Sequence, residues 1–138
     1  MCSNNNENSC SCFTDILCTI VALQKKINCK DASMCSCSKP YLGGDVLTSS
    51  YNTRPITIYN CCNSELWRVA YTLNGEPGRS TVFRIENVED CCATFRVLAA
   101  NPEATTLSPY VLTDSFFTIN LNCIGALKCL DDVYVSGI

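Results

Sequence analysis

Hydrophobic side chains follow two different periods along this chain. Near the amino terminus they recur at three- and four-residue spacing, with Asp15 expected in the first turn and Lys25-Lys26 in the last. This spacing is typical of an amphipathic helix, because residues three and four positions apart share one helix face. The sequence therefore predicts a helix over residues 14–28.

After residue 55 the period becomes that of strands. Short apolar segments alternate with polar residues, and Asn, Gly and Pro separate them. Several short strands divided by turn residues are typical of an antiparallel β-sandwich or jelly-roll, so we predict a mainly β fold with one helix. The expected strands cover residues 56–62, 66–73, 81–88, 91–99 and 116–123, with a short strand at 133–135, a turn at 74–78 and a loop at 101–114.

Two cysteine-rich stretches precede the strands. Residues 1–12 are polar and rich in asparagine, and we expect them to form a flexible arm. Residues 29–54 are rich in turn-forming residues and are expected to form a connector. The predicted organisation is an arm over 1–12 and a single domain over 13–138, made of helix 14–28, connector 29–54 and β-sandwich 55–138.

Composition narrows the possible partners. Charged residues make up 17% of the chain, below the roughly 25% of average soluble proteins, and Lys25-Lys26 is the longest basic run. We therefore expect no nucleic acid partner. The longest apolar stretch, 16–23, is much shorter than the roughly 20 residues of a membrane helix, so no membrane insertion is expected. No secretory signal is recognised in residues 1–12, which predicts synthesis in the cytoplasm and later oxidation.

Residues and motifs typical of active sites are scarce in this chain. The chain has no histidine, and its glycines lack the spacing of a phosphate-binding loop. We expect no enzyme and no cofactor. One alternative is a thiolate metal-binding or redox-buffering protein, because Cys35 and Cys37 lie near Cys29; however, the paired C-x2-C spacing of zinc sites is missing, and no metal is expected.

Cysteine is the distinctive residue type. Thirteen cysteines in 138 residues indicate a disulfide scaffold rather than a cytosolic enzyme. An odd number cannot all pair within one chain, so complete oxidation would require a bond to another molecule. Crosslinking between molecules is therefore expected.

Strand parity divides the thiols into two sets. Successive side chains of a strand point to opposite faces, so Cys61-Cys62 and Cys91-Cys92 each have one inward and one outward thiol. Apolar neighbours put Cys62, Cys91 and Cys123 inward. The expected links between copies are at Cys2, Cys10, Cys12, Cys61 and Cys92. The cysteines expected to be buried or paired within the chain are Cys18, Cys29, Cys35, Cys37, Cys62, Cys91, Cys123 and Cys129.

Three stretches resemble the CotY/CotZ/ExsY family of Bacillus-type spore coat and exosporium proteins. They are Asn52-Thr-Arg-Pro55, the strand-like residues 82–98 with Cys91-Cys92, and residues 119–130. The resemblance covers most of residues 12–135. Gly125 stands where the family pattern has the second cysteine of a Cys-x-Cys pair.

The resemblance implies a structural protein rather than an enzyme. Proteins of this family self-assemble, through hexameric units, into disulfide-stabilised two-dimensional layers in the outer coat or exosporium of the spore. Copies of the chain itself and other coat proteins are the implied partners. Family members are made in the mother-cell cytoplasm without a signal peptide and are deposited on the forespore. An alternative within the same class is a subunit of a disulfide-linked spore appendage fibre.

Overall fold

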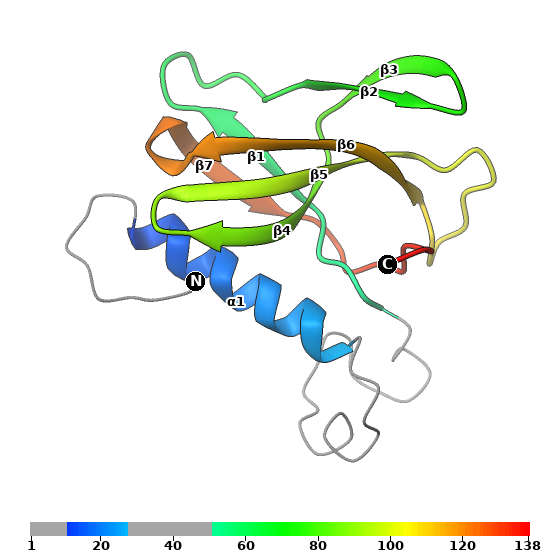
Figure 1. Ribbon diagram of the computed structural model, residues 1–138, viewed down its shortest axis with the longest axis horizontal. Coiled ribbons are helices and arrows are strands. Elements are labelled where there is room, and N and C mark those ends of the chain that lie inside the picture. The colour runs from blue at the N-terminus through cyan, green and yellow to red at the C-terminus, as the bar shows by residue number, and fades with distance from the viewer. Residues whose placement is uncertain (1–10, 28–50) are drawn as a thin grey trace.

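A computed structural model describes residues 11–27 and 51–138, which form one α-helix, seven strands and a short 3-10 turn (Figure 1). A five-stranded antiparallel sheet has the order β6-β5-β4-β1-β7, and β2 and β3 form a two-stranded sheet. The mainly β fold with an N-terminal helix that the sequence predicts is confirmed. The elements are α1 (Ser11–Ile27), β1 (Ile56–Asn60), β2 (Val69–Leu73), β3 (Glu76–Ser80), β4 (Phe83–Glu89), β5 (Cys92–Ala100), β6 (Tyr110–Asn120), η2 (Leu121–Cys123) and β7 (Ile124–Cys129).

The sheet brings the first and last strands of the chain together. β4, β5 and β6 follow one another as antiparallel neighbours, while β1 pairs with β7 over its whole length and with β4 only at Ile56↔Phe83. In Figure 1, α1 lies along the lower side of this sheet and the β2–β3 hairpin lies above it. The second sheet is thus a hairpin rather than a layer of equal size.

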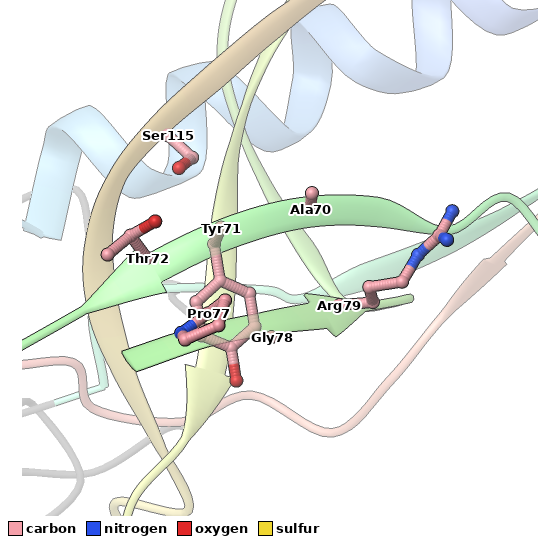
Figure 2. A pocket seen from close by; sticks show the side chains of 7 residues that line it. All are labelled: Ala70, Tyr71, Thr72, Pro77, Gly78, Arg79 and Ser115. Carbon is pink, nitrogen blue, oxygen red and sulfur yellow. The ribbon is translucent and has the colours of Figure 1, made fainter. Parts of the chain in front are cut away.

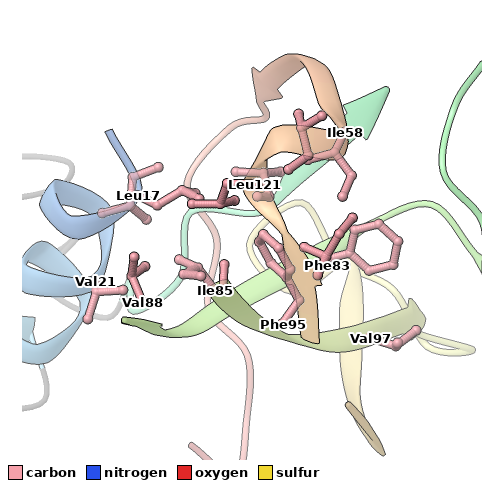
Figure 3. Close-up of a cluster of buried hydrophobic side chains, with 14 residues drawn as sticks. Leu17, Val21, Ile58, Phe83, Ile85, Val88, Phe95, Val97 and Leu121 are labelled. Atoms are coloured by element: carbon pink, nitrogen blue, oxygen red, sulfur yellow. The ribbon is translucent and has the colours of Figure 1, made fainter. Parts of the chain in front are cut away.

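Apolar side chains from the helix and the sheet form the main core (Figure 3). The Phe117 ring centroid lies 4.9 Å from that of Phe83 and 5.4 Å from that of Phe95, distances at which aromatic rings attract one another. Leu17 and Val21 of α1 complete the core from the helix side. Each fully buried Leu or Phe stabilises the fold by about 1.5–3 kcal/mol through its hydrophobic area alone.

The helix is joined to the sheet by a buried amide as well as by apolar packing. Nε2 of Gln24 donates to the Ile85 carbonyl at 3.0 Å, and its Oε1 accepts from the Arg54 N–H at 3.1 Å. Because Gln24 is almost fully buried, these bonds fix α1 against β4 and against the segment that enters β1.

The helix begins at Ser11, earlier than the predicted start at residue 14. Phe13 packs against the core, and the buried Thr14 donates to the Asp90 carbonyl at 3.4 Å, so contacts with the sheet stabilise this extra turn. Cys12 therefore lies in the helix rather than in the expected arm. Asp15 lies beyond the first turn, which contains no acidic residue.

The segment predicted as a turn over 74–78 is instead a tight turn followed by β3. In this segment the φ angles of Asn74 (54°) and Gly75 (81°) are positive, as a two-residue hairpin turn requires. Pro77 is tolerated in β3 because that strand pairs only with β2. Gly78 makes room for the Tyr71 ring, since a Cβ there would lie 2.6 Å from it (Figure 2).

Several other boundaries differ from the prediction. β6 begins at Tyr110, inside the segment expected to be a loop, and β7 occupies residues for which no strand was expected. Residues 133–135 contribute only an isolated bridge, between Val133 and Thr53. β1 ends at Asn60, before the two cysteines that were expected to continue it.

Residues 52–54, at the start of the Asn52-Thr-Arg-Pro55 stretch noted in the sequence, form a network of buried hydrogen bonds. The Asn52 side chain donates to the Val135 carbonyl at 3.0 Å and accepts from its N–H at 2.9 Å. The Arg84 guanidinium, 7% exposed, donates to the Thr53 hydroxyl at 3.0 Å. Because these groups are buried and satisfied, the stretch holds the C-terminal segment against β4. Within the described residues, no helix is long and apolar enough to cross a membrane.

Candidate functional site

Five exposed cysteines that form no disulfide lie at one end of the described domain. We call this group the thiol end; its members are Cys12, Cys61, Cys62, Cys92 and Cys123. In Figure 1 the start of α1, the end of β1, the β4–β5 turn and the η2 turn all lie at the left side of the domain. The sequence separations between these cysteines gave no indication that they would meet.

Backbone contacts connect the four segments of the thiol end. The Thr14 hydroxyl donates to the Asp90 carbonyl, which places the start of α1 beside the β4–β5 turn. The Leu121 N–H donates to the Cys91 carbonyl at 2.7 Å, which joins η2 to the same turn. The Cys61 N–H donates to the Cys123 carbonyl at 3.0 Å, so the end of β1 lies against η2. The arrangement is therefore built into the backbone of the fold.

Two asparagines explain why the burial expected for Cys62 and Cys123 is wrong. Asn60 ends β1, and its side chain accepts the Cys62 N–H at 2.7 Å. Asn120 ends β6, and its side chain accepts the Asn122 N–H at 2.9 Å. Asparagine side chains that bond the backbone two residues ahead turn the chain, so strand alternation stops at these positions. Both thiols are consequently exposed.

The predicted alternation of inward and outward side chains holds at the β4–β5 turn. Cys92 is exposed and Cys91 is half-buried against the main core, as the alternation through Phe95 predicts. Cys91 is disulfide-bonded, as is Cys18, which packs against the same core from α1. These two cysteines belong to the set expected to be buried or paired within the chain.

Cys61 interacts with other members of the thiol end. Its Sγ donates to the Asn122 carbonyl at 3.6 Å. The pKa of the Cys61 thiol is raised, first by desolvation, then by a hydrogen bond with Cys62 and by charge repulsion from Cys62 and Cys123. Cys61 therefore holds its proton more tightly than a fully hydrated thiol, and its neighbours Cys62 and Cys123 are close enough to influence it.

Cys129 lies away from this group. It ends β7 and pairs with Ile56 at the start of β1, while the thiol end lies beyond Asn60. From Ile56 to Cys61 the separation along the chain is roughly 17 Å, from about 3.3 Å per residue. Cys129 was expected to be buried or internally paired and is exposed instead, because the edge strand β7 is covered only by β1.

A hollow of about 680 Å³ with both polar and apolar walls adjoins Cys129. Its lining includes Tyr51, Tyr110, Lys128 and Asp131. Burial and the Asp131 carboxylate raise the pKa of the Tyr110 phenol above its ordinary value. A second, open hollow of about 440 Å³ lies over the β2–β3 hairpin and has Arg79 as its charged side chain (Figure 2).

Metal ligands are not grouped in the part of the chain that the structure describes. Among residues 11–27 and 51–138, no three Cys, Asp or Glu side chains lie so that they could hold a metal ion. The alternative of a thiolate site rested on Cys29, Cys35 and Cys37, which lie outside the described residues, as do Cys2 and Cys10. The chemistry that the described residues offer is that of surface thiols.

The described residues thus form a small, mainly β domain that carries exposed thiols. The sequence model of the family described as Spore coat protein Z matches residues 1–110, and the chain belongs to this family. The resemblance drawn from the sequence is confirmed, although residues 119–130 lie beyond the match. No curated protein and no solved structure matches the chain. Membership of this family gives the chain a structural role in the spore coat, a coat location and assembly with coat proteins.

Proposed function

We propose that the chain self-assembles into a disulfide-crosslinked two-dimensional layer of the spore outer coat or exosporium. The observation that carries this proposal is the thiol end, where five exposed thiols face outward together. A disulfide requires two Cα atoms within about 4.4–6.8 Å, so only surface thiols can join separate molecules. Copies of the chain that meet at this end would have several possible bonds.

The position of Cys129 supports extension beyond pairs. Molecules with reactive thiols at one end alone form closed pairs or small clusters. A second exposed thiol at the other end of β7 gives each copy another point of attachment. Cys2 and Cys10, outside the described residues, are proposed as further links through the amino-terminal segment.

The composition agrees with a durable assembly. A net charge of −3 with 17% charged residues provides little electrostatic repulsion between copies. Disulfides between copies make assembly effectively irreversible in an oxidising environment. We propose that the protein acts as a structural subunit without catalysis and that its thiols oxidise after deposition on the spore.

Gel electrophoresis with and without reductant tests crosslinking. Oxidised protein is expected to run as a ladder of multimers that collapses to the monomer in dithiothreitol. A variant with serine at Cys12, Cys61, Cys62, Cys92 and Cys123 should lose most of the ladder, whereas a matched variant of five exposed serines or threonines changed to alanine should keep it. A native protein that remains monomeric after oxidation would refute the proposal.

A fibre is a second candidate, favoured by the separation of Cys129 from the thiol end. Links between opposite ends of successive copies would generate a filament rather than a sheet. Electron microscopy of oxidised assemblies distinguishes the two, because a sheet shows order in two directions and a filament in one. The layer is better supported, because several thiols at one end together with Cys129 at the other allow each copy to join more than two neighbours, which a filament does not require.

A further inference from the structure

Cys61 and Cys123 lie opposite each other where β1 and β7 stop pairing. The antiparallel register runs to Asn60↔Ile124, and the Cys61 N–H bond to the Cys123 carbonyl, at 3.0 Å, continues it by one residue. This hydrogen bond holds the two residues side by side, although Cys61 follows the last residue of β1 and Cys123 is the last residue of η2. The charge of Cys123 also acts on the Cys61 thiol, so a bond between the two sulfurs requires a local movement rather than a change of fold.

The two side chains also lie on the same exposed surface. Neither forms a disulfide, and each is accessible to a reagent or to another molecule. The Cys61 thiol points toward η2, since its Sγ donates to the carbonyl of Asn122, the residue before Cys123. Each thiol is thus available both to a second copy of the chain and to its neighbour across the strand pair.

We propose that Cys61 and Cys123 form an intramolecular thiol–disulfide exchange pair that can release a disulfide made with another copy. This inference rests on the proposed crosslinking at the thiol end. When Cys61 holds such a disulfide, the Cys123 thiolate attacks the Cys61 sulfur. The Cys61–Cys123 bond forms, the bond to the other copy breaks, and the departing sulfur takes up the proton that Cys123 lost.

The exchange is balanced without any further oxidant. One disulfide is consumed and one is formed, and the reverse attack by the thiol of another copy restores the crosslink. A growing layer would thereby exchange wrongly placed bonds at this position before they become permanent. The crosslink at Cys61 is then adjustable, whereas a link at Cys92 or Cys129 has no described thiol placed opposite it.

Cys62 is a poorer partner for Cys61 despite its position next to it. Consecutive Cα atoms are about 3.8 Å apart, below the roughly 4.4–6.8 Å of ordinary disulfides. Cys123 belongs to a different chain segment, held beside Cys61 by a backbone hydrogen bond, so this short spacing of neighbouring residues does not apply to it. The pair is therefore assigned across the strands and not along the chain.

A small aromatic disulfide tests the exchange without a second copy. The full-length protein, with its disulfides intact, is treated with one equivalent of dithiobis-nitrobenzoate, and the products are mapped by mass spectrometry. An isolated thiol keeps a thionitrobenzoate adduct, whereas an exchange pair expels it and closes an internal disulfide. We expect a Cys61–Cys123 disulfide in the native protein and a Cys61 adduct that lives at least roughly tenfold longer in Cys123→Ser.

Matched variants complete the test. Cys92→Ser removes an exposed thiol of the same end and should leave the exchange unchanged, and Cys62→Ser should also preserve it. A Cys61 adduct that is as long-lived in the native protein as in Cys123→Ser would overturn the inference, as would an internal bond to Cys62. If the native protein forms crosslinks but Cys61 does not exchange its adduct, the inference fails and the proposed function stands. If Cys61 exchanges its adduct but the protein never forms crosslinks, only the proposed function is refuted.

Discussion

Arg54 and Asp132 join the segment before β1 to the segment after β7. Nε and Nη2 of Arg54 donate to the two carboxylate oxygens of Asp132 at 2.7 and 2.9 Å. Arg96 and Asp114 form a looser pair at 3.5 Å in which Asp114 is fully exposed. Two parallel bonds with fixed geometry stabilise more than a single contact that water surrounds. The two pairs therefore differ in energy although both are surface salt bridges.

Replacing each aspartate by asparagine tests whether the two ion pairs contribute different free energies to stability. Asp132→Asn should lower the free energy of unfolding by about 1 kcal/mol, because it weakens a two-bond pair that is only partly exposed. Asp114→Asn is the control and should change it by less than about 0.5 kcal/mol. Urea unfolding of both variants measures the difference. Equal losses in the two variants would show that the geometry of the Arg54 pair contributes nothing.

The raised pKa of Cys61 predicts slow alkylation. A raised pKa means a smaller thiolate fraction at a given pH, so the reaction of Cys61 with iodoacetamide should accelerate at higher pH than in the unfolded chain. Cys62→Ala removes a hydrogen-bond partner and a repelling charge, which should move the profile of Cys61 toward lower pH, while desolvation keeps part of the shift. Peptide mass spectrometry at a series of pH values measures this; coincident folded and unfolded profiles would contradict it.

Residue-level prediction from the sequence succeeded where strands are regular. The alternation that placed Cys92 outward and Cys91 inward holds because β5 continues without a break. It failed for Cys62 and Cys123 because Asn60 and Asn120 end their strands by bonding the backbone ahead. An asparagine just before a cysteine pair is a readable turn signal, and it was outweighed by the apolar pattern. The Cys61–Cys123 contact needed the pairing of β1 with β7, which no local pattern encodes.

At the scale of helices and strands, some elements were predicted from the sequence and others were missed. The helix and the β4–β5 hairpin have strong periodicity and were found. β3 was missed because Pro77 and Gly78 are typical turn residues, yet an edge strand tolerates them. β7 was missed because its sequence, IGALKC, does not alternate apolar and polar residues and contains Gly125.

Two glycines in these missed strands allow close approaches of different kinds. A Cβ on Gly125 would lie 3.0 Å from Cys61 Cα, which is backbone of the neighbouring chain segment. A Cβ on Gly78 would lie 2.6 Å from the Tyr71 ring, which is the far end of a movable side chain. The first contact can be relieved only by moving the end of β1, and the second by rotating a side chain.

Alanine substitutions should reveal this difference. Gly125→Ala is expected to lower the free energy of unfolding by about 1–3 kcal/mol, because it overpacks β7 against the β1 backbone. Gly78→Ala should cost less, about 1 kcal/mol or below, since Tyr71 swings away. Thermal or urea unfolding measures both. A larger loss in Gly78→Ala than in Gly125→Ala would show that the β2–β3 hairpin, and not the β1–β7 junction, is the tightly packed one.

On the scale of the whole molecule, topology decides where the thiols meet. β1 and β7 are far apart in sequence, but their pairing brings Cys61-Cys62 beside Cys123, and the β4–β5 turn adds Cys92. Cys129 remains at the opposite end of the same strand pair. The family match explains why cysteines are abundant, and the fold explains how the described ones are arranged.

This arrangement predicts the pattern of bonds between copies. Oxidised assemblies made from equal amounts of ¹⁴N- and ¹⁵N-labelled protein carry mixed-isotope peptides only where two different molecules are joined. Among the described cysteines, most mixed-isotope disulfides should include at least one member of the thiol end, because those thiols are clustered and exposed together. Cys129→Ser should keep these bonds but shift the multimers to smaller sizes, since one point of attachment is lost. If mixed-isotope bonds occur at Cys129 but not at the thiol end, copies do not meet through that end, and its thiols serve only bonds within one chain.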